Sequence, residues 1–117
     1  MGAFAAGQIV VLPFPFSDLS QSKFRPALLL AEVGRGDWIA CQITSNPYAD
    51  AHAIALSEAD FATGNLQLIS YVRPGKLFTA NEALFSGTAG ALSGAVLKRV
   101  RKAVAGLVNG EGVAPAS

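Results

Sequence analysis

The chain has 117 residues, of which 51% are hydrophobic and 15% are charged. This length fits a single domain, and this composition excludes an intrinsically disordered chain. The net charge of +1 also excludes a protein that binds nucleic acid through bulk positive charge, although a neutral protein can still carry a local basic groove.

The residue types that build covalent or metal sites are scarce. There is one cysteine, Cys41, and one histidine, His52, so an intrachain disulfide is excluded and we expect no metal or other cofactor. A single cysteine favours a reducing, cytoplasmic compartment. Residues 1–16 lack a basic start and contain Pro13 and Pro15, which argues against a signal peptide or a membrane span. The surplus of apolar residues predicts a homo-oligomer.

The first half of the chain reads as short strands joined by turns. The β-branched run 9–12 predicts a strand that ends in a proline-stiffened segment, and the polar residues 17–23 predict a loop. Two apolar runs, 26–31 and 38–43, flank the glycines of 34–36. This spacing predicts a β-hairpin.

The second half continues this pattern up to residue 85. We expect a loop at 45–50, a strand at 53–56 and a helical turn at 57–61 that stops near Gly64. Strands are predicted at 69–72 and 76–79, separated by Arg73-Pro74-Gly75, and a capped turn is predicted at 81–85.

The C-terminal part differs, because apolar residues recur there at helical spacing between Val96 and Val108, with Ser93 as the N-cap. The sequence therefore predicts a mostly β fold of five or six short strands, favouring a small barrel, with one C-terminal helix. We expect one domain over residues 1–117, with a core at about 7–108 and a flexible tail at 109–117.

Two positions at the junctions of strands and loops could carry chemistry. Arg25 stands where the polar loop enters the second strand, and Thr44 and Ser45 stand where the third strand ends. Taken alone, such an arginine is most often a solvated charge, and such a Thr-Ser pair most often bonds the local backbone. The basic residues at 98–102 could extend a path for RNA. More often, such charges are simply the solvent-exposed face of a helix.

Four segments of the sequence resemble the MazF/PemK family of toxins. Val10–Leu19 is similar to its first strand and loop, and Lys23–Leu30 to its Arg-Pro-Ala and aliphatic run. Cys41–Ser45 resembles the Ile-Thr-Ser that closes the third strand, and Ser70–Thr79 resembles a later strand pair. The resemblance runs in order from about residue 7 to 108. It departs at Gln8 and in the helix's first turn, where the family commonly has acids.

The resemblance implies an SH3-like, twisted antiparallel barrel that usually forms a homodimer. It further implies a toxin of a type II toxin-antitoxin system that cleaves single-stranded RNA without a metal, and that a cognate antitoxin neutralises. Arg25 and Thr44 match the family's two principal catalytic positions. We expect phosphate or base contacts from the residues of the bordering loops and from one lysine, namely Ser17, Asp18, Lys23, Ser45, Asn46 and Lys76.

The chemistry of those residues suits RNA cleavage. The ribose 2′-hydroxyl can attack its own phosphate and leave a 2′,3′-cyclic phosphate and a 5′-hydroxyl, so no protein nucleophile is needed. A guanidinium matches the oxygens that gain charge, and a threonine hydroxyl can both donate and accept. Neither group is a good base, and Asp18 is the only nearby carboxylate, although an Asx turn also explains it.

Two other functions remain open at the level of sequence. One is a non-catalytic toxin on the same fold that inhibits DNA gyrase, and the other is a silent SH3-like interaction module. The aromatic residues Phe14, Phe16 and Trp38 are similarly open, because such residues can stack on bases but more often belong to a core.

Overall fold

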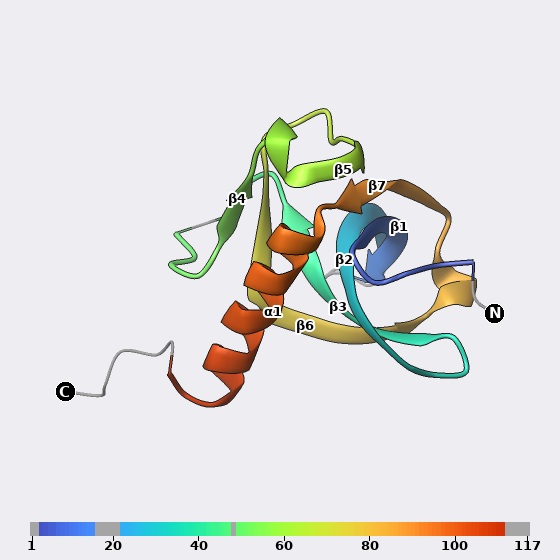
Figure 1. The fold of residues 1–117 in the computed structure, drawn as a ribbon. Coiled ribbons are helices and arrows are strands. Elements are labelled where there is room, and N and C mark those ends of the chain that lie inside the picture. The colour runs from blue at the N-terminus through green and yellow to red at the C-terminus, as the bar shows by residue number, and fades with distance from the viewer. Residues whose placement is uncertain (1–2, 16–21, 48, 112–117) are drawn as a thin grey trace.

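The computed structural model describes residues 3–15, 22–47 and 49–111. In these ranges the chain forms a strongly curled antiparallel sheet, and helix α1 packs across one side of the sheet (Figure 1). The strands of the sheet are β1 Gln8–Pro15, β2 Ser22–Gly34, β3 Asp37–Thr44, β4 Ile54–Leu56, β5 Phe61–Gly64, β6 Ser70–Asn81 and β7 Gly87–Leu92. Two short 3-10 turns, η1 Glu58–Asp60 and η2 Glu82–Leu84, precede β5 and β7, and α1 spans Gly94–Val108.

The strand order across the sheet is β4-β6-β3-β2-β1-β7-β5, and every neighbouring pair is antiparallel. The long strands β2 and β3 lie at the centre of this order, and the short strands β4 and β5 form its two edges. The prediction of a mostly β, SH3-like twisted barrel with one C-terminal helix is confirmed, in the form of a curled half-barrel.

The hairpin of β2 and β3 is confirmed at its predicted turn. Gly34 and Gly36 have positive φ angles of 116° and 79°, which glycine adopts without the steric cost that a side chain brings. The ladder between the two strands is irregular at Leu29/Ala31 and again at Glu32/Gly34. Such bulges increase local twist, and here they bend the hairpin that forms the middle of the barrel.

Both faces of the sheet carry apolar clusters, because side chains alternate along each strand. One cluster includes Ile9, Leu28 and Ile43, and α1 covers it with Val96 and Val100. The other cluster lies on the opposite face and includes Leu12, Ala27 and Trp38, among others. Trp38 is therefore a core residue, and its indole N–H donates to Glu82 Oε2 at 3.3 Å.

The C-terminal helix begins where the sequence predicts. The Ser93 side chain accepts a hydrogen bond from the Val96 amide at 3.3 Å, which caps the first turn. In the described part of the chain, no helix is long and apolar enough to cross a membrane.

One basic residue of α1 has a structural role that the sequence did not reveal. Arg101 donates to the backbone oxygen of Leu30 from Nε at 3.1 Å and from Nη2 at 2.6 Å. Leu30 lies within the Leu29/Ala31 irregularity of the β2–β3 ladder. The guanidinium therefore ties the helix to the sheet at this bulge.

Replacing Arg101 with alanine is expected to lower the free energy of unfolding by about 1 kcal/mol, because a carbonyl in the sheet loses both of these donors. Urea denaturation followed by circular dichroism measures this loss. The matched control is Arg99→Ala, since Arg99 is exposed two residues earlier on the same helix. Equal stability of the two variants would contradict a structural role for Arg101.

Three features of the sheet differ from the sequence prediction. The two strands predicted at 69–72 and 76–79 form one strand, β6, and the strands β5 and β7 were not predicted. In β6, residues 73–76 stand opposite the single residue Gln42, because Cys41 pairs with Leu77 and Ile43 with Val72. Pro74 cannot donate to a ladder, so the strand bulges there rather than ending.

Candidate functional site

A groove of about 420 Å³ lies where β2 begins and β3 ends. Arg25, Thr44 and Ser45, which the sequence analysis singled out, all line it. The remaining lining residues come from these two strands and from the segment before β6, namely Phe24, Pro26, Ile43, Leu66, Gln67, Leu68 and Ser70. Residues from three distant parts of the sequence thus meet at one end of the sheet.

The register of the central hairpin explains why Arg25 and Thr44 lie at the same end of the sheet. Ala27 and Gln42 form the last pair of the β2–β3 ladder at this end of the sheet, and Arg25 and Thr44 each lie two residues beyond that pair. On the other side of β2, Arg25 pairs with Leu12 of β1. Arg25 is therefore held in place within the sheet by the pairing of β2 with β1.

Thr44 is 6% exposed, and its hydroxyl is engaged by the loop that follows. Its Oγ1 accepts a hydrogen bond from the Asn46 amide at 3.1 Å and donates one to the Asn46 carbonyl at 3.0 Å. This is the local backbone role common for threonine at a strand end. A hydroxyl oxygen has two lone pairs, so Thr44 keeps one acceptor site beyond these two bonds.

The loop after Thr44 is fastened to β6 by an ion pair. Arg73 Nε donates to Asp50 Oδ2 at 2.8 Å, and the two side chains are only 18% and 13% exposed. Asp50 Oδ1 accepts from the His52 amide at 2.9 Å. The hydrogen bond from Arg73 holds the pKa of the Asp50 carboxyl below its ordinary value. This arrangement fixes the loop that carries Asn46, the hydrogen-bond partner of Thr44.

The Asp50–Arg73 pair predicts a pH-dependent contribution to stability. Because the folded pKa of Asp50 is lowered, its contribution is present above the unfolded value of about 4 and is lost as the pH falls through the folded value. Asp50→Asn should cost about 1 kcal/mol at pH 7, because a pair near the surface is screened. Wild-type and variant unfolding curves should converge in acid, and a difference that is independent of pH would contradict this account.

The other predicted contact residues are distributed differently. Lys76 lines a neighbouring groove rather than this one. Asn46 contributes through its backbone bonds to Thr44. Ser17 and Asp18 lie outside the described residues, and so does Phe16. Lys23 is described only through its backbone, which pairs with Phe14 in the β1–β2 ladder.

Sequence reasoning missed the segment that closes the groove before β6. Leu66, Gln67 and Leu68 line the groove, and Leu68 is 68% exposed. Phe24, next to Arg25, is 61% exposed. Exposed large apolar side chains beside a groove are typical of surfaces that a partner covers. The sequence gives no pattern that would place this segment opposite β2, because the contact depends on the curl of the sheet.

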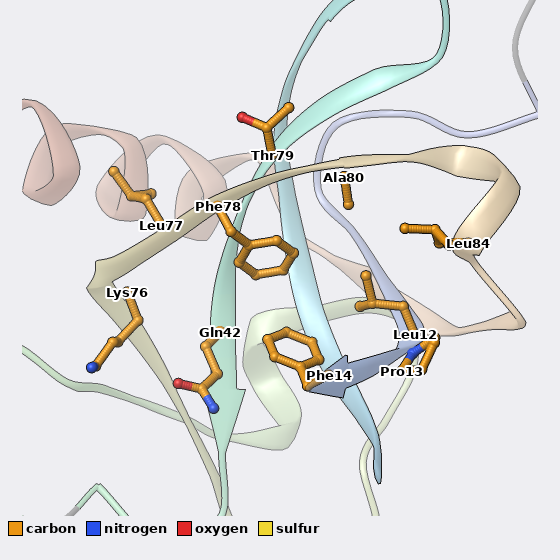
Figure 2. A pocket seen from close by; sticks show the side chains of 10 residues that line it. All are labelled: Leu12, Pro13, Phe14, Gln42, Lys76, Leu77, Phe78, Thr79, Ala80 and Leu84. Carbon is orange, nitrogen blue, oxygen red and sulfur yellow. The ribbon is translucent and has the colours of Figure 1, made fainter. Parts of the chain in front are cut away.

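The neighbouring groove has a volume of about 430 Å³ and is mostly apolar (Figure 2). Phe14 of β1 and Phe78 of β6 pack edge to face in it, with ring centroids 4.9 Å apart. Figure 2 shows Gln42 and Lys76 at one end of the groove and Leu84 toward the other. Gln42 comes directly before the residues 43–45 of the first groove, and the two grooves have no lining residue in common.

The single cysteine takes no part in either groove. Cys41 is buried in the cluster that α1 covers, and burial raises the pKa of its thiol to about 12. The reactive form of cysteine is the thiolate, so this side chain is inert as a nucleophile at neutral pH.

Comparison with known proteins identifies the family. Residues 5–108 match the family described as PemK-like, MazF-like toxins of type II toxin-antitoxin systems. The chain belongs to this family. It is a MazF-like toxin, as the resemblance of its four segments implied. No curated protein sequence matches the toxin.

Solved structures agree with this toxin in fold. A chain of the MazE–MazF complex (Form-II) of Deinococcus radiodurans has a TM-score of 0.72 at 22% identity, and the match covers 93% of the toxin and 98% of that chain. A mycobacterial endoribonuclease in complex with its cognate antitoxin has a TM-score of 0.68 at 17% identity, covering 93% and 96%. Mycobacterium tuberculosis toxin MazF-mt6 has a TM-score of 0.66 at 15% identity, covering 87% and 96%.

Proposed function

We propose that this toxin is an endoribonuclease that cleaves single-stranded RNA without a metal ion, with Arg25 and Thr44 as its catalytic residues. The observation that carries the proposal is that both residues line one groove, at the same end of β2 and β3. Membership of a toxin family supports it, and so does the shared fold with a mycobacterial protein described as an endoribonuclease.

In the proposed reaction the RNA supplies the nucleophile. The 2′-oxygen attacks the adjacent phosphorus, the bond from phosphorus to the 5′-oxygen breaks, and the products carry a 2′,3′-cyclic phosphate and a 5′-hydroxyl. The proton of the 2′-hydroxyl is released and the departing 5′-oxygen takes up a proton, so the reaction is balanced without an added reagent. Catalysis then consists of orienting the phosphate and stabilising the charge on its oxygens.

Each residue has a distinct part in this reaction. The planar guanidinium of Arg25 presents paired donors to the non-bridging oxygens, and it stays charged at neutral pH. The Thr44 hydroxyl is oriented by its two bonds to Asn46, and its remaining lone pair can accept from the 2′-hydroxyl. Ser45 lines the same groove and can donate to phosphate. For the general base, Asp18 remains our candidate, although it lies outside the described residues.

The proposal includes partners. We expect a homodimer in the cytoplasm and a cognate antitoxin with a flexible segment that lies over the groove and blocks Arg25. A solved relative is described as bound to its cognate antitoxin, which supports this expectation. The exposed side chains of Phe24, Leu68 and Ile69 offer apolar surface that such a segment or a second copy could cover.

The decisive experiment maps cleavage ends on single-stranded RNA in the presence of EDTA. The wild-type protein should produce fragments with 5′-hydroxyl ends, and Thr44→Ala should slow their formation. The matched control is Thr88→Ala, because Thr88 is exposed on β7 away from both grooves. Intact RNA after treatment with folded wild-type protein would refute the proposal. Growth arrest that survives Arg25→Ala would instead favour a gyrase inhibitor, and a harmless protein would favour an interaction module.

A further inference from the structure

We propose that the apolar groove between β1 and β6 is a base subsite, which holds one unstacked base of the RNA next to the cleaved phosphate. Its floor is aromatic and aliphatic, and its two polar side chains that could recognise a nucleotide, Gln42 and Lys76, stand together at one end (Figure 2). This inference rests on the endoribonuclease activity proposed above and adds the residues that determine which base is chosen.

The position of the groove relative to Arg25 and Thr44 is the first argument. Gln42 and Thr44 are two residues apart on β3, so their side chains share one face and their backbones are separated by about 7 Å. Leu12 lines the groove and pairs directly with Arg25 across β1 and β2. A phosphate bound at Arg25 and Thr44 therefore places its neighbouring nucleotide at the mouth of this groove.

The lining of the groove suits an unstacked base. The Phe14 and Phe78 rings contact each other edge to face and leave apolar ring surface in the groove. Single-stranded bases pack on aromatic side chains, and each such contact is worth about 1–3 kcal/mol. The volume of about 430 Å³ lies in the range of roughly 300–1,000 Å³ that is typical of small-ligand sites.

The polar end of the groove suits the hydrogen-bonding edge and the charge of a nucleotide. The Gln42 amide has donors and an acceptor, which suits the hydrogen-bonding edge of a base. The bulge of β6 at residues 73–76 lies opposite Gln42, and Lys76 ends that bulge. None of the described residues that line the groove is acidic, so the charge of Lys76 is not offset within the lining. An anionic, base-carrying ligand fits this end better than an apolar peptide does.

The alternation of β6 shows which side chains form the groove. Phe78 and Ala80 point into it, whereas Leu77 and Thr79 point away (Figure 2). Gln42 is a polar residue between the buried Cys41 and Ile43, and it is only partly buried itself. A polar side chain at the mouth of an apolar groove is expected where a ligand is recognised.

The test measures base preference and binding separately. Cleavage ends are sequenced from a randomised RNA pool treated with wild type, Gln42→Leu and Lys76→Ala, with Lys98→Ala on the exposed face of α1 as the control. Gln42→Leu should weaken the preference for one base beside the cut by about tenfold. Lys76→Ala should raise KM for all sequences and reduce the salt dependence of binding, with little change in kcat.

Binding of short 2′-O-methyl RNA, which cannot be cleaved, keeps the inference testable if no cleavage occurs. Affinity for this probe should fall for Gln42→Leu and Lys76→Ala and stay unchanged for Lys98→Ala. Gln42→Asn and melting curves distinguish the loss of recognition from a loss of folding. Cleavage with an unaltered base preference in Gln42→Leu would overturn the base subsite and leave the endoribonuclease standing. Variants that lose only antitoxin binding would identify the groove as a peptide site and would also overturn it.

Discussion

Arg25→Ala is expected to lower kcat for RNA cleavage by about a hundredfold to a thousandfold. The guanidinium brings a positive charge to the groove that Thr44 also lines, and the phosphorane formed by the attacking 2′-oxygen gathers negative charge on its oxygens. A donor directed at such charge contributes about 2.7–4 kcal/mol to the stability of the transition state. Because substrate in the ground state carries less of this charge, KM should change less than kcat.

Two further variants serve as comparisons for Arg25→Ala. Arg25→Lys keeps the charge but loses the planar, paired donors, so its activity should lie between those of wild type and Arg25→Ala. Arg99→Ala removes an exposed arginine from α1 and should leave the rate unchanged. The rates are measured with a fluorescent RNA substrate, and melting curves verify folding. A fully active, folded Arg25→Ala variant would remove Arg25 from the mechanism.

Much of the fold could be predicted from the sequence because its signals are local. The β2–β3 hairpin is specified by two apolar runs around the glycines at 34–36, and the C-terminal helix by the spacing of Val96, Val100 and Val104. In these elements the propensity of each segment agrees with its final structure. The hairpin also places Arg25 and Thr44 at the same end of the sheet, although β2 begins at Ser22, so that Arg25 lies inside the strand and not at its entry as predicted.

The missed elements depend on contacts far apart in the sequence. β7 has the sequence Gly-Thr-Ala-Gly-Ala-Leu, which has low strand propensity, and it becomes a strand because it fits between β1 and β5. Likewise, the sequence could place Arg25, Thr44 and Ser45 together but not the residues that complete the groove. Leu66–Leu68 line the same groove as Arg25 because the sheet curls, and Lys76 lies at the second groove, at the end of the bulge in β6.

The dependence of the fold on β7 leads to a prediction about Gly90. Gly90→Ala should lower the free energy of unfolding by about 2–3 kcal/mol. Gly90 has a φ angle of 144°, which side chains rarely adopt, and a Cβ there would lie 2.5 Å from the Thr63 carbonyl oxygen. β7 cannot move away from β5 to make room for the added Cβ, since Gly90 pairs with Gly64 on β5 and, on its other side, with Ile9 on β1.

The same strand provides a matched control. A Cβ at Gly87 would meet nothing within 4 Å, so Gly87→Ala should leave stability unchanged or raise it slightly. Urea unfolding should show a lower midpoint for Gly90→Ala with an unchanged slope. Equal midpoints for the two variants would mean that the close approach of β5 and β7 does not hold in solution. Because Gly90 lies in neither groove, RNA cleavage per folded molecule should stay at the wild-type rate, which separates its effect from that of Arg25→Ala.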